Sequence, residues 1–382
     1  MLAQFTSVMK RALLTAVVSI FGIMQNSFAE DKFGLTTTIF NDNSGLAVQA
    51  PMFQLAKDLS EVSIFSMHLL IDRVNIPPFR GISGAPVPTD AVTGASRPAT
   101  ADSGDGSFIK RRSEVLATWT YRRADFSGYY SAESDYIGRL VSVGINKDYL
   151  QKNTNFAVRL AYGSDTVKPT GRDSTLSKTS LLGNATLTQT LSKKTIMRLG
   201  LDMSYSDGFQ SNPYRLVSVG GGNFPETHPQ TRIRVAGFAK LNTYIKSMDA
   251  ALWFDYRLYG DDWGVRSHAL GVKFYQNMSK RLLMRYRYRF YTQSQAYFYQ
   301  DVYSITQTPT FFTGDYKLMH FHSHIFGVKA VYHAPFLERW LRFATDPELS
   351  VKYERFFTSE NFAFTTANFG ANILQIGVSF GY

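Results

Sequence analysis

The last residues of the chain, Asn372 to Tyr382, alternate strictly between apolar and small or polar side chains, and this pattern restricts the fold more than any other. The apolar positions are Leu374, Ile376, Val378, Phe380 and Tyr382, and Gln375, Gly377, Ser379 and Gly381 lie between them. Successive side chains of a β-strand point to opposite faces, so the spacing predicts a strand with one apolar face. A terminal strand of a soluble β-sandwich is the alternative interpretation.

The first residues have the pattern of a secretory signal. Lys10 and Arg11 precede an apolar stretch at residues 12–24, and Ser27-Phe28-Ala29 forms a small-x-small cleavage site. The apolar stretch is shorter than the about 20 residues that a spanning helix needs. We therefore expect residues 1–29 to be a cleaved signal peptide and residues 30–382 to form a single domain.

The composition favours an exported β-protein over several other classes. The chain has 30 Phe, 22 Tyr and 4 Trp, yet its mean hydropathy is only −0.16, a combination typical of strands that alternate between lipid and a polar interior. It has no Cys, which excludes disulfides, thiolate nucleophiles and zinc-thiolate sites. The formal net charge is +11, but the basic residues are interleaved within the expected strands and form no patch, so nucleic acid is not an expected partner.

Alternating runs separated by turn residues recur along the whole chain, and we count sixteen of them. They are expected at residues 33–41, 46–55, 62–74, 111–123, 126–134, 137–147, 153–164, 179–190, 195–206, 231–241, 248–259, 265–276, 281–291, 319–332, 349–357 and 372–382. Short turns are expected near Lys57, Asp125, Asp148, Ser192, Ser247 and Asn277, and long loops near residues 77–106, 207–230 and 292–317. Gly220-Gly221-Gly222 is expected to be a flexible loop tip.

These runs predict an all-β transmembrane antiparallel barrel in the bacterial outer membrane. Strands of about ten residues match a tilted membrane crossing. Within hydrocarbon every backbone amide needs a partner, so the sheet must close on itself. Short turns on one side and long loops on the other are the asymmetry of such barrels. One merged or split hairpin would change the strand count to fourteen or eighteen.

The run Arg281 to Phe290 identifies the face that points inward. Arg285, Arg287 and Arg289 alternate with apolar and aromatic residues, and three arginines facing lipid would cost several kcal/mol. The same alternation in the two preceding runs gives the other pore-lining candidates, Asp255, Arg257 and Lys273. Two interpretations stay open: an arginine ladder that attracts anions, or mutually paired charges that hold the wall together.

Neither a metal site nor a catalytic motif is expected. His320, His322 and His324 share one face of their run, but this face is opposite to that of Lys329, which predicts outward-facing histidines near the rim. The chain has no H-E-x-x-H or P-loop motif. We therefore expect neither an enzyme nor a cofactor, with a hydrolase built from Ser and His on adjacent strands as the remaining alternative.

Three segments together resemble an uncharacterised family of predicted outer-membrane proteins that is known as a domain of unknown function. They are Asp90 to Ser96, Tyr205 to Arg215 and Asp261 to His268. The final strand departs from the family, whose last strand is more acidic and aromatic. The resemblance implies an outer-membrane barrel without an assigned substrate or catalytic residue, and as partners an envelope redox protein or a lipoprotein.

The same segments supply candidate outer-loop anchors. These are Asp207, Arg215, Asp261, Asp262, Trp263 and Arg266, which combine turn-forming residues with charges that can tie loops together. The final strand also resembles the C-terminal signal read by the barrel-insertion machinery, so outer-membrane lipid and that machinery are expected partners. The function expected from all of this is a channel or transporter with a basic lumen for small anionic or polar solutes. The alternative is a scaffold that holds a redox or secreted partner across the outer membrane.

Overall fold

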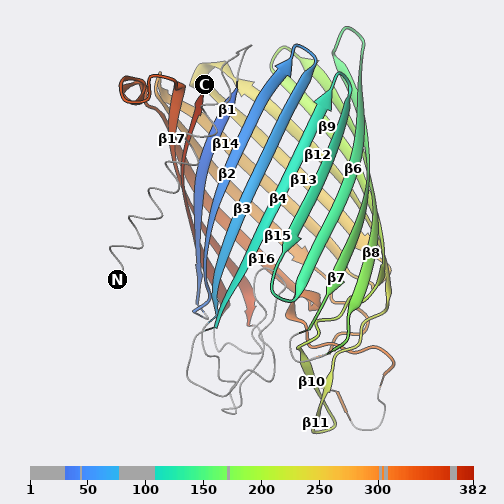
Figure 1. Ribbon diagram of the computed structural model, residues 1–382. Coiled ribbons are helices and arrows are strands. Elements are labelled where there is room, and N and C mark those ends of the chain that lie inside the picture. The colour runs from blue at the N-terminus through green and yellow to red at the C-terminus, as the bar shows by residue number, and fades with distance from the viewer. Residues whose placement is uncertain are drawn as a thin grey trace, which may run out of the picture.

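Sixteen antiparallel strands close into a barrel (Figure 1). The computed structural model describes residues 31–43, 45–76, 108–169, 173–300, 303–304, 309–361 and 368–382. Each barrel strand pairs with the strands before and after it in the barrel, and β1 pairs with β18 to close the sheet. The predicted fold and strand count are confirmed, while the expected signal peptide, the loop at residues 77–106 and the segment Asp90 to Ser96 lie outside the described residues.

The barrel strands are β1 (Lys32–Asp42), β2 (Ala47–Ser60), β3 (Ser63–Ile76), β4 (Phe108–Tyr121), β5 (Ala124–Ala132), β6 (Tyr136–Tyr149), β7 (Thr154–Val167), β8 (Leu176–Ser192), β9 (Thr195–Gly208), β12 (Thr231–Ile245), β13 (Ala250–Asp261), β14 (Arg266–Ser279), β15 (Leu282–Gln293), β16 (Phe321–His333), β17 (Thr345–Asn361) and β18 (Asn368–Gly381). A separate hairpin consists of β10 (Leu216–Val219) and β11 (Gly222–Pro225). Short 3-10 helices are η1 (Lys246–Met248), η2 (Tyr316–Leu318) and η3 (Pro335–Arg339). Within the described ranges, no helix has the length and apolar character that a membrane crossing needs.

Short turns gather at one end of the barrel, and the longer loops gather at the other (Figure 1). Two turns lie a few residues from their expected positions, at Glu61–Val62 and Arg122–Arg123 rather than at Lys57 and Asp125. β1 begins opposite the end of β18, with Lys32 paired to Gly381, so both ends of the sheet lie on the turn side. An even strand count requires this arrangement.

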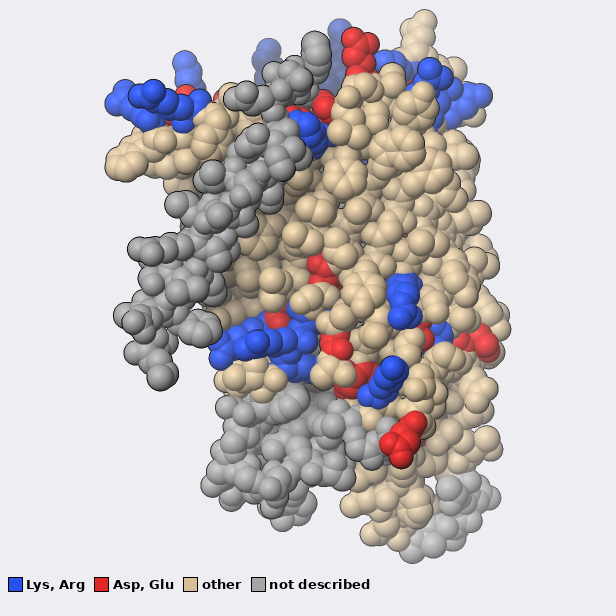
Figure 2. Space-filling model, viewed as in Figure 1, with Lys and Arg blue, Asp and Glu red and all other residues tan. Residues whose placement is uncertain are grey.

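The outer face of the barrel is apolar, as the alternation predicts. On β18, Leu374, Ile376 and Val378 share the outward face, and Ile376 is 52% exposed. The inward positions of this strand hold Gln375, Gly377 and Ser379, beside Thr36 and Thr38 of β1. Figure 2 shows few charged residues on the middle of the visible outer surface, with Lys, Arg, Asp and Glu concentrated at the turn end and near the loop end. Such a neutral band is what a lipid-facing surface requires.

The loop at residues 209–230 packs against the described residues 294–300, 303–304 and 309–320 of the loop between β15 and β16. Val219 pairs with Tyr303, and Thr227 pairs with Phe312. Gly220 and Gly221 have φ of 59° and 84° and form a two-residue hairpin turn, for which glycine is suited because both positions need positive φ. The expected flexible tip is therefore a defined turn, because the hairpin packs on the neighbouring loop through Val217, Val219, Tyr303 and Phe312.

Candidate functional site: the β12–β17 wall and the loop cap

The inner face of strands β12 to β17, which we call the β12–β17 wall, brings together all six pore-lining candidates. The three arginines of β15 have their Cα partners on β14. Arg285 lies opposite Tyr275, Arg287 opposite Lys273 and Arg289 opposite Gly271. One strand further, Lys273 lies opposite Trp253 and Gly271 lies opposite Asp255. Since Cα partners point to the same side of a sheet, these residues share one face. The other face carries the exposed Phe254, Tyr256 and Tyr286 and is therefore the outer one.

Glycines allow long charged side chains to lie flat on this wall. A Cβ on Gly271 would lie 2.2 Å from a carboxylate oxygen of Asp255, and a Cβ on Gly327 would lie 2.8 Å from Cγ of Glu354. Glu354 thereby reaches across β16 and accepts from Arg287 at 2.8 Å. Its other cationic neighbours are Lys352 at 3.3 Å and Arg285 at 4.0 Å. Glu354 thus neutralises part of the arginine ladder.

Other cations on the β12–β17 wall form no ion pair with a described residue, although Asp255 shares the wall with them. Within the described part of the chain, no ion pair is formed by Arg234, Lys240, Lys273, Arg289 or Lys329. Lys273 instead lies 5.7 Å from the centroid of the Trp253 ring, and Arg289 lies 5.5 Å from that of Tyr291. Cation–π contacts of this kind orient a cation without cancelling its charge. The wall therefore combines a paired group around Glu354 with a set of cations that keep their charge.

A cavity of about 260 Å³ lies where this wall meets the loops. Its cationic lining residues are Arg232, Arg257, Arg289 and Lys317, and Tyr259 and Tyr291 add hydroxyl groups. Arg257 is paired with Asp202 of β9 at 2.6 Å, and Arg289 has no ion pair among the described residues. Guanidinium and hydroxyl donors together suit a small anion.

The opposite wall, formed by β3 to β8, has a different electrostatic character because its charges are paired. Lys110 contacts Glu133 at 2.7 Å and Asp135 at 2.6 Å. Further ion pairs join Arg112 to Asp72 and Glu114, Arg159 to Asp125 and Lys178 to Asp165. A cavity of about 530 Å³ lies between this wall and residues 209–214. The described inward cations of β3 to β8 are therefore paired, unlike several of those on the β12–β17 wall.

The loop cap, as we call it, comprises the described loop residues 209–230, 262–265, 294–300, 303–304 and 309–320. It is centred on the buried Glu226. Its carboxylate accepts from the Thr313 hydroxyl at 2.7 Å and from the backbone N–H of Asn212 at 2.6 Å. Arg215, one of the expected anchors, lies 3.6 Å from Glu226 and 2.8 Å from Asp315. Burial by itself would raise the pKa of the Glu226 carboxyl, but the His228 ring 3.5 Å away and the charge of Arg215 hold it below its usual value.

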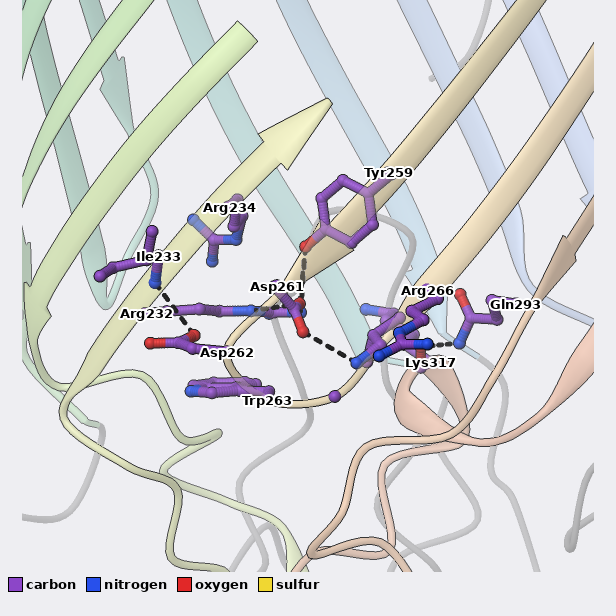
Figure 3. A network of polar contacts seen from close by, with 12 residues as sticks. Arg232, Ile233, Arg234, Tyr259, Asp261, Asp262, Trp263, Arg266, Gln293 and Lys317 are labelled. Atoms are coloured by element: carbon purple, nitrogen blue, oxygen red, sulfur yellow. Dashed lines mark hydrogen bonds and ion pairs between the residues drawn. The ribbon is translucent and has the colours of Figure 1, made fainter. Parts of the chain in front are cut away.

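Asp261 fixes the turn between β13 and β14 to the inner wall (Figure 3). Its carboxylate accepts from the Tyr259 hydroxyl at 2.7 Å and from the Arg232 guanidinium at 2.5 Å. It also accepts from the backbone N–H of Val265 at 2.9 Å, which closes the turn. The partner of this anchor is thus Arg232 rather than one of the arginines considered in the sequence.

The two residues after Asp261 attach the same turn to β12. Asp262 accepts from the backbone N–H of Ile233 at 3.0 Å. The Trp263 indole N–H donates to the carbonyl of Thr231 at 3.0 Å, and the Arg232 guanidinium lies 3.9 Å from the ring centroid (Figure 3). Trp263 also packs against His228 and Phe298, which joins all three loops of the cap.

The remaining two anchor candidates lie at strand ends. Asp207 is the Cα partner of Thr231 on β12, and Arg266 donates its backbone N–H to the Ser294 hydroxyl at 2.9 Å. Neither side chain forms an ion pair with another described residue. Their role as anchors stays a prediction.

Sequence reasoning did not select Glu354, Arg232, Glu226 or Asp315. The alternation of Arg232 and Arg234 in the run at residues 231–241 was a usable signal, because it repeats the pattern of the arginine ladder. Glu226 and Asp315 gave no such signal, because their role depends on loops that meet only in the folded molecule.

The histidine run lies on the outward side of β16. His324 stacks on Phe357 and lies 3.1 Å from the Tyr288 hydroxyl through Nδ1, and His322 contacts Phe290. Among the described residues there is no group of three or more His, Cys, Asp or Glu that could hold a metal ion.

The closed sheet defines the class of the molecule. It is a sixteen-stranded antiparallel β-barrel of outer-membrane architecture. The chain belongs to the family described as "Protein of unknown function (DUF3570)", whose model matches residues 12–344. That match ends just before β17, so the last two strands lie outside it. A search of curated proteins found no match.

Among solved structures, similar folds come from outer-membrane proteins of Gram-negative bacteria. OmpTΔL8, a loop L8 deletion mutant of OmpT from Vibrio cholerae, is 7% identical, with a TM-score of 0.43 over 92% of this chain and 98% of that chain. A BenF-like porin from Pseudomonas fluorescens is 10% identical, with a TM-score of 0.43 over 92% and 98%. A mutant of the ferric enterobactin receptor PfeA from Pseudomonas aeruginosa is 12% identical, with a TM-score of 0.45 over 88% of this chain and 55% of that chain.

Proposed function

We propose that this protein is a channel or transporter of the bacterial outer membrane that passes small anionic or polar solutes along the β12–β17 wall. The observation that carries the proposal is the uneven pairing of interior charges. Lys273, Arg289 and Lys329 have no ion pair among the described residues, whereas the described cations of the opposite wall, such as Lys110 and Arg112, contact carboxylates.

Unpaired cations on one wall favour anions for an electrostatic reason. Charges of one sign in a cleft with low-dielectric walls focus the field and raise the local concentration of counter-ions. Rings and rows of Arg and Lys are accordingly used for selectivity in anion pores. The cavity beside Arg257 and Arg289 lies at the loop end of the same wall and serves in this proposal as a first binding position for an entering anion.

The test is the conductance of the refolded protein in a planar bilayer, with a salt gradient to measure the reversal potential. The proposal predicts anion preference, and replacing Arg285, Arg287 and Arg289 by Gln should move the reversal potential toward that of a cation-preferring pore. The matched control replaces Arg139, Lys147 and Arg355 by Gln, which removes the same charge from the outward face. Anion preference that is equal in both variants would contradict the proposed role of the wall.

A second candidate is a scaffold that holds a redox or secreted partner, and the β10–β11 hairpin favours it. The hairpin projects beyond the loop end of the barrel (Figure 1), and Leu216 and Phe224 are 39% and 49% exposed. Absence of conductance from a correctly folded barrel, together with a copurified haem, flavin or lipoprotein that is lost on changing Phe224 to Ser, would establish this function in place of the channel.

A further inference from the structure

Two arginines face each other on the outer surface of the barrel. Arg73 of β3 and Arg111 of β4 are direct Cα partners. Their neighbours Asp72 and Arg112 point inward and form an ion pair with each other, so the side chains of Arg73 and Arg111 point outward. Both arginines are exposed, and neither forms an ion pair with another described residue.

The pair is unfavourable in the absence of an anion. Like charges directly opposite each other on neighbouring strands destabilise a sheet. The described outward positions of β2, β3, β4 and β5 carry neither Asp nor Glu that could relieve the repulsion. Figure 2 shows Lys and Arg residues near the loop end of this face, with Asp and Glu residues beside some of them. The described residues therefore leave room for an external anion as the partner of this pair.

The position of the pair along the strand points to a lipid headgroup. Tyr121, at the other end of β4, lies ten residues from Arg111 and is 41% exposed beside Trp119. Ten residues extend about 33 Å along a strand, which at a tilt of about 40° spans about 25 Å, the height of the apolar band of a membrane barrel. The two guanidinium groups thus lie one hydrocarbon thickness away from the aromatic residues at the turn end.

The surroundings match the two parts of a lipid. Gln49 is the Cα partner of Arg73 on β2 and adds an amide donor at the same level. Toward the turn end, the outward positions become apolar, with Leu69 and Ile71 of β3 37% and 49% exposed. Polar donors at the interface and apolar side chains below them suit a headgroup and its acyl chains.

We propose that Arg73 and Arg111 bind the phosphate of a lipid headgroup in the leaflet on the loop side of the membrane. Guanidinium groups bind phosphate oxygens in a bidentate way, and two of them on adjacent strands can share one phosphate. The inference concerns the outer surface and is independent of the solute that the barrel passes.

The experiment is native mass spectrometry of the refolded full-length barrel in detergent, with lipid A as the probe and enzymatically dephosphorylated lipid A as its counterpart. Lipid A should bind at least tenfold more tightly than the dephosphorylated form. Replacing Arg73 and Arg111 by Gln should abolish this difference, while replacing Arg122 and Arg123 by Gln, in the turn at the other end of β4, should preserve it.

Two outcomes would overturn the proposal. Equal binding of the two lipids to the wild-type barrel would show that the phosphate is not recognised. Inorganic phosphate that competes with lipid A at equal concentration would show a site for free anions rather than for a lipid. A heat-dependent mobility shift on a denaturing gel, retained by each variant, ensures that a loss of binding is not a loss of folding.

Discussion

The Arg287 guanidinium donates to a carboxylate oxygen of Glu354 at 2.8 Å, although the two residues lie on strands that do not pair with each other. β16 lies between them, and Gly327 is the residue of β16 at which the two side chains meet. Because glycine has no side chain, Glu354 can lie across the strand and reach the ladder. Glu354 therefore neutralises part of the charge of Arg285 and Arg287, whereas Arg289 has no ion pair among the described residues.

Replacing Glu354 by Gln should therefore change selectivity and stability in opposite directions. The variant leaves Arg287, Arg285 and Lys352 without their shared carboxylate, so anion preference should rise in a salt-gradient reversal potential. Leaving these partly buried donors without a charged acceptor should lower the free energy of unfolding by about 1 kcal/mol in a urea titration. The control is Glu348→Gln, which removes the same charge from a residue that has no ion pair among the described residues; an equal loss of stability in this control would contradict the prediction.

Gly200 should tolerate no side chain, whereas Gly237, which precedes its cross-strand partner Phe238, should. A Cβ on Gly200 would lie 2.1 Å from Cζ of Phe238, and a Cβ on Gly237 would meet nothing within 4 Å. Gly200→Ala should cost about 1–3 kcal/mol through overpacking, measured by urea unfolding of the refolded barrel. Gly237→Ala should stabilise slightly or leave stability unchanged, because alanine restricts the unfolded chain more than glycine does. Equal effects at both positions would show that Phe238 moves aside freely.

The loop cap should lose stability in acid because of Glu226. The pKa of its carboxyl is lower in the folded cap than the ordinary value of 4.5. A lowered pKa means that the unfolded cap binds the proton more tightly, so stability is present above pH 4.5 and is lost as the pH falls through the folded pKa. Limited proteolysis of the loop cap should accelerate below this pH. In Glu226→Gln the cap should be cut faster at neutral pH, and the acid-dependent acceleration should be weaker; an unchanged acid dependence would assign it to another group.

Much of the fold followed from the sequence because the barrel leaves its pattern in each strand separately. Alternation in Arg281 to Phe290 and in Asn372 to Tyr382 identifies the inward and outward faces without knowledge of any neighbour, since the period of two is a local property of a strand. The even strand count and the contrast between short turns and long loops are also local. The sequence also predicted the face on which Arg285, Arg287 and Arg289 lie.

The sequence did not determine which of those charges are neutralised. Glu354 lies in a run that carries no ladder of its own, and its contact with Arg287 depends on the register of three strands and on the glycine between them. The sequence left open whether the arginines are paired or free. In the structure Arg285 and Arg287 are paired with Glu354, and Arg289 has no ion pair among the described residues.

The sequence by itself determined the alternating strands, their number and the face of each side chain, because these depend on backbone geometry and on the avoidance of charge in lipid. Only the tertiary structure decided the partners across strands and loops: Glu354 with Arg287, Asp261 with Arg232, and Arg73 opposite Arg111. The physical reason is that register and loop packing are set by closure of the whole sheet, so a contact between residues far apart in the chain has no local signal.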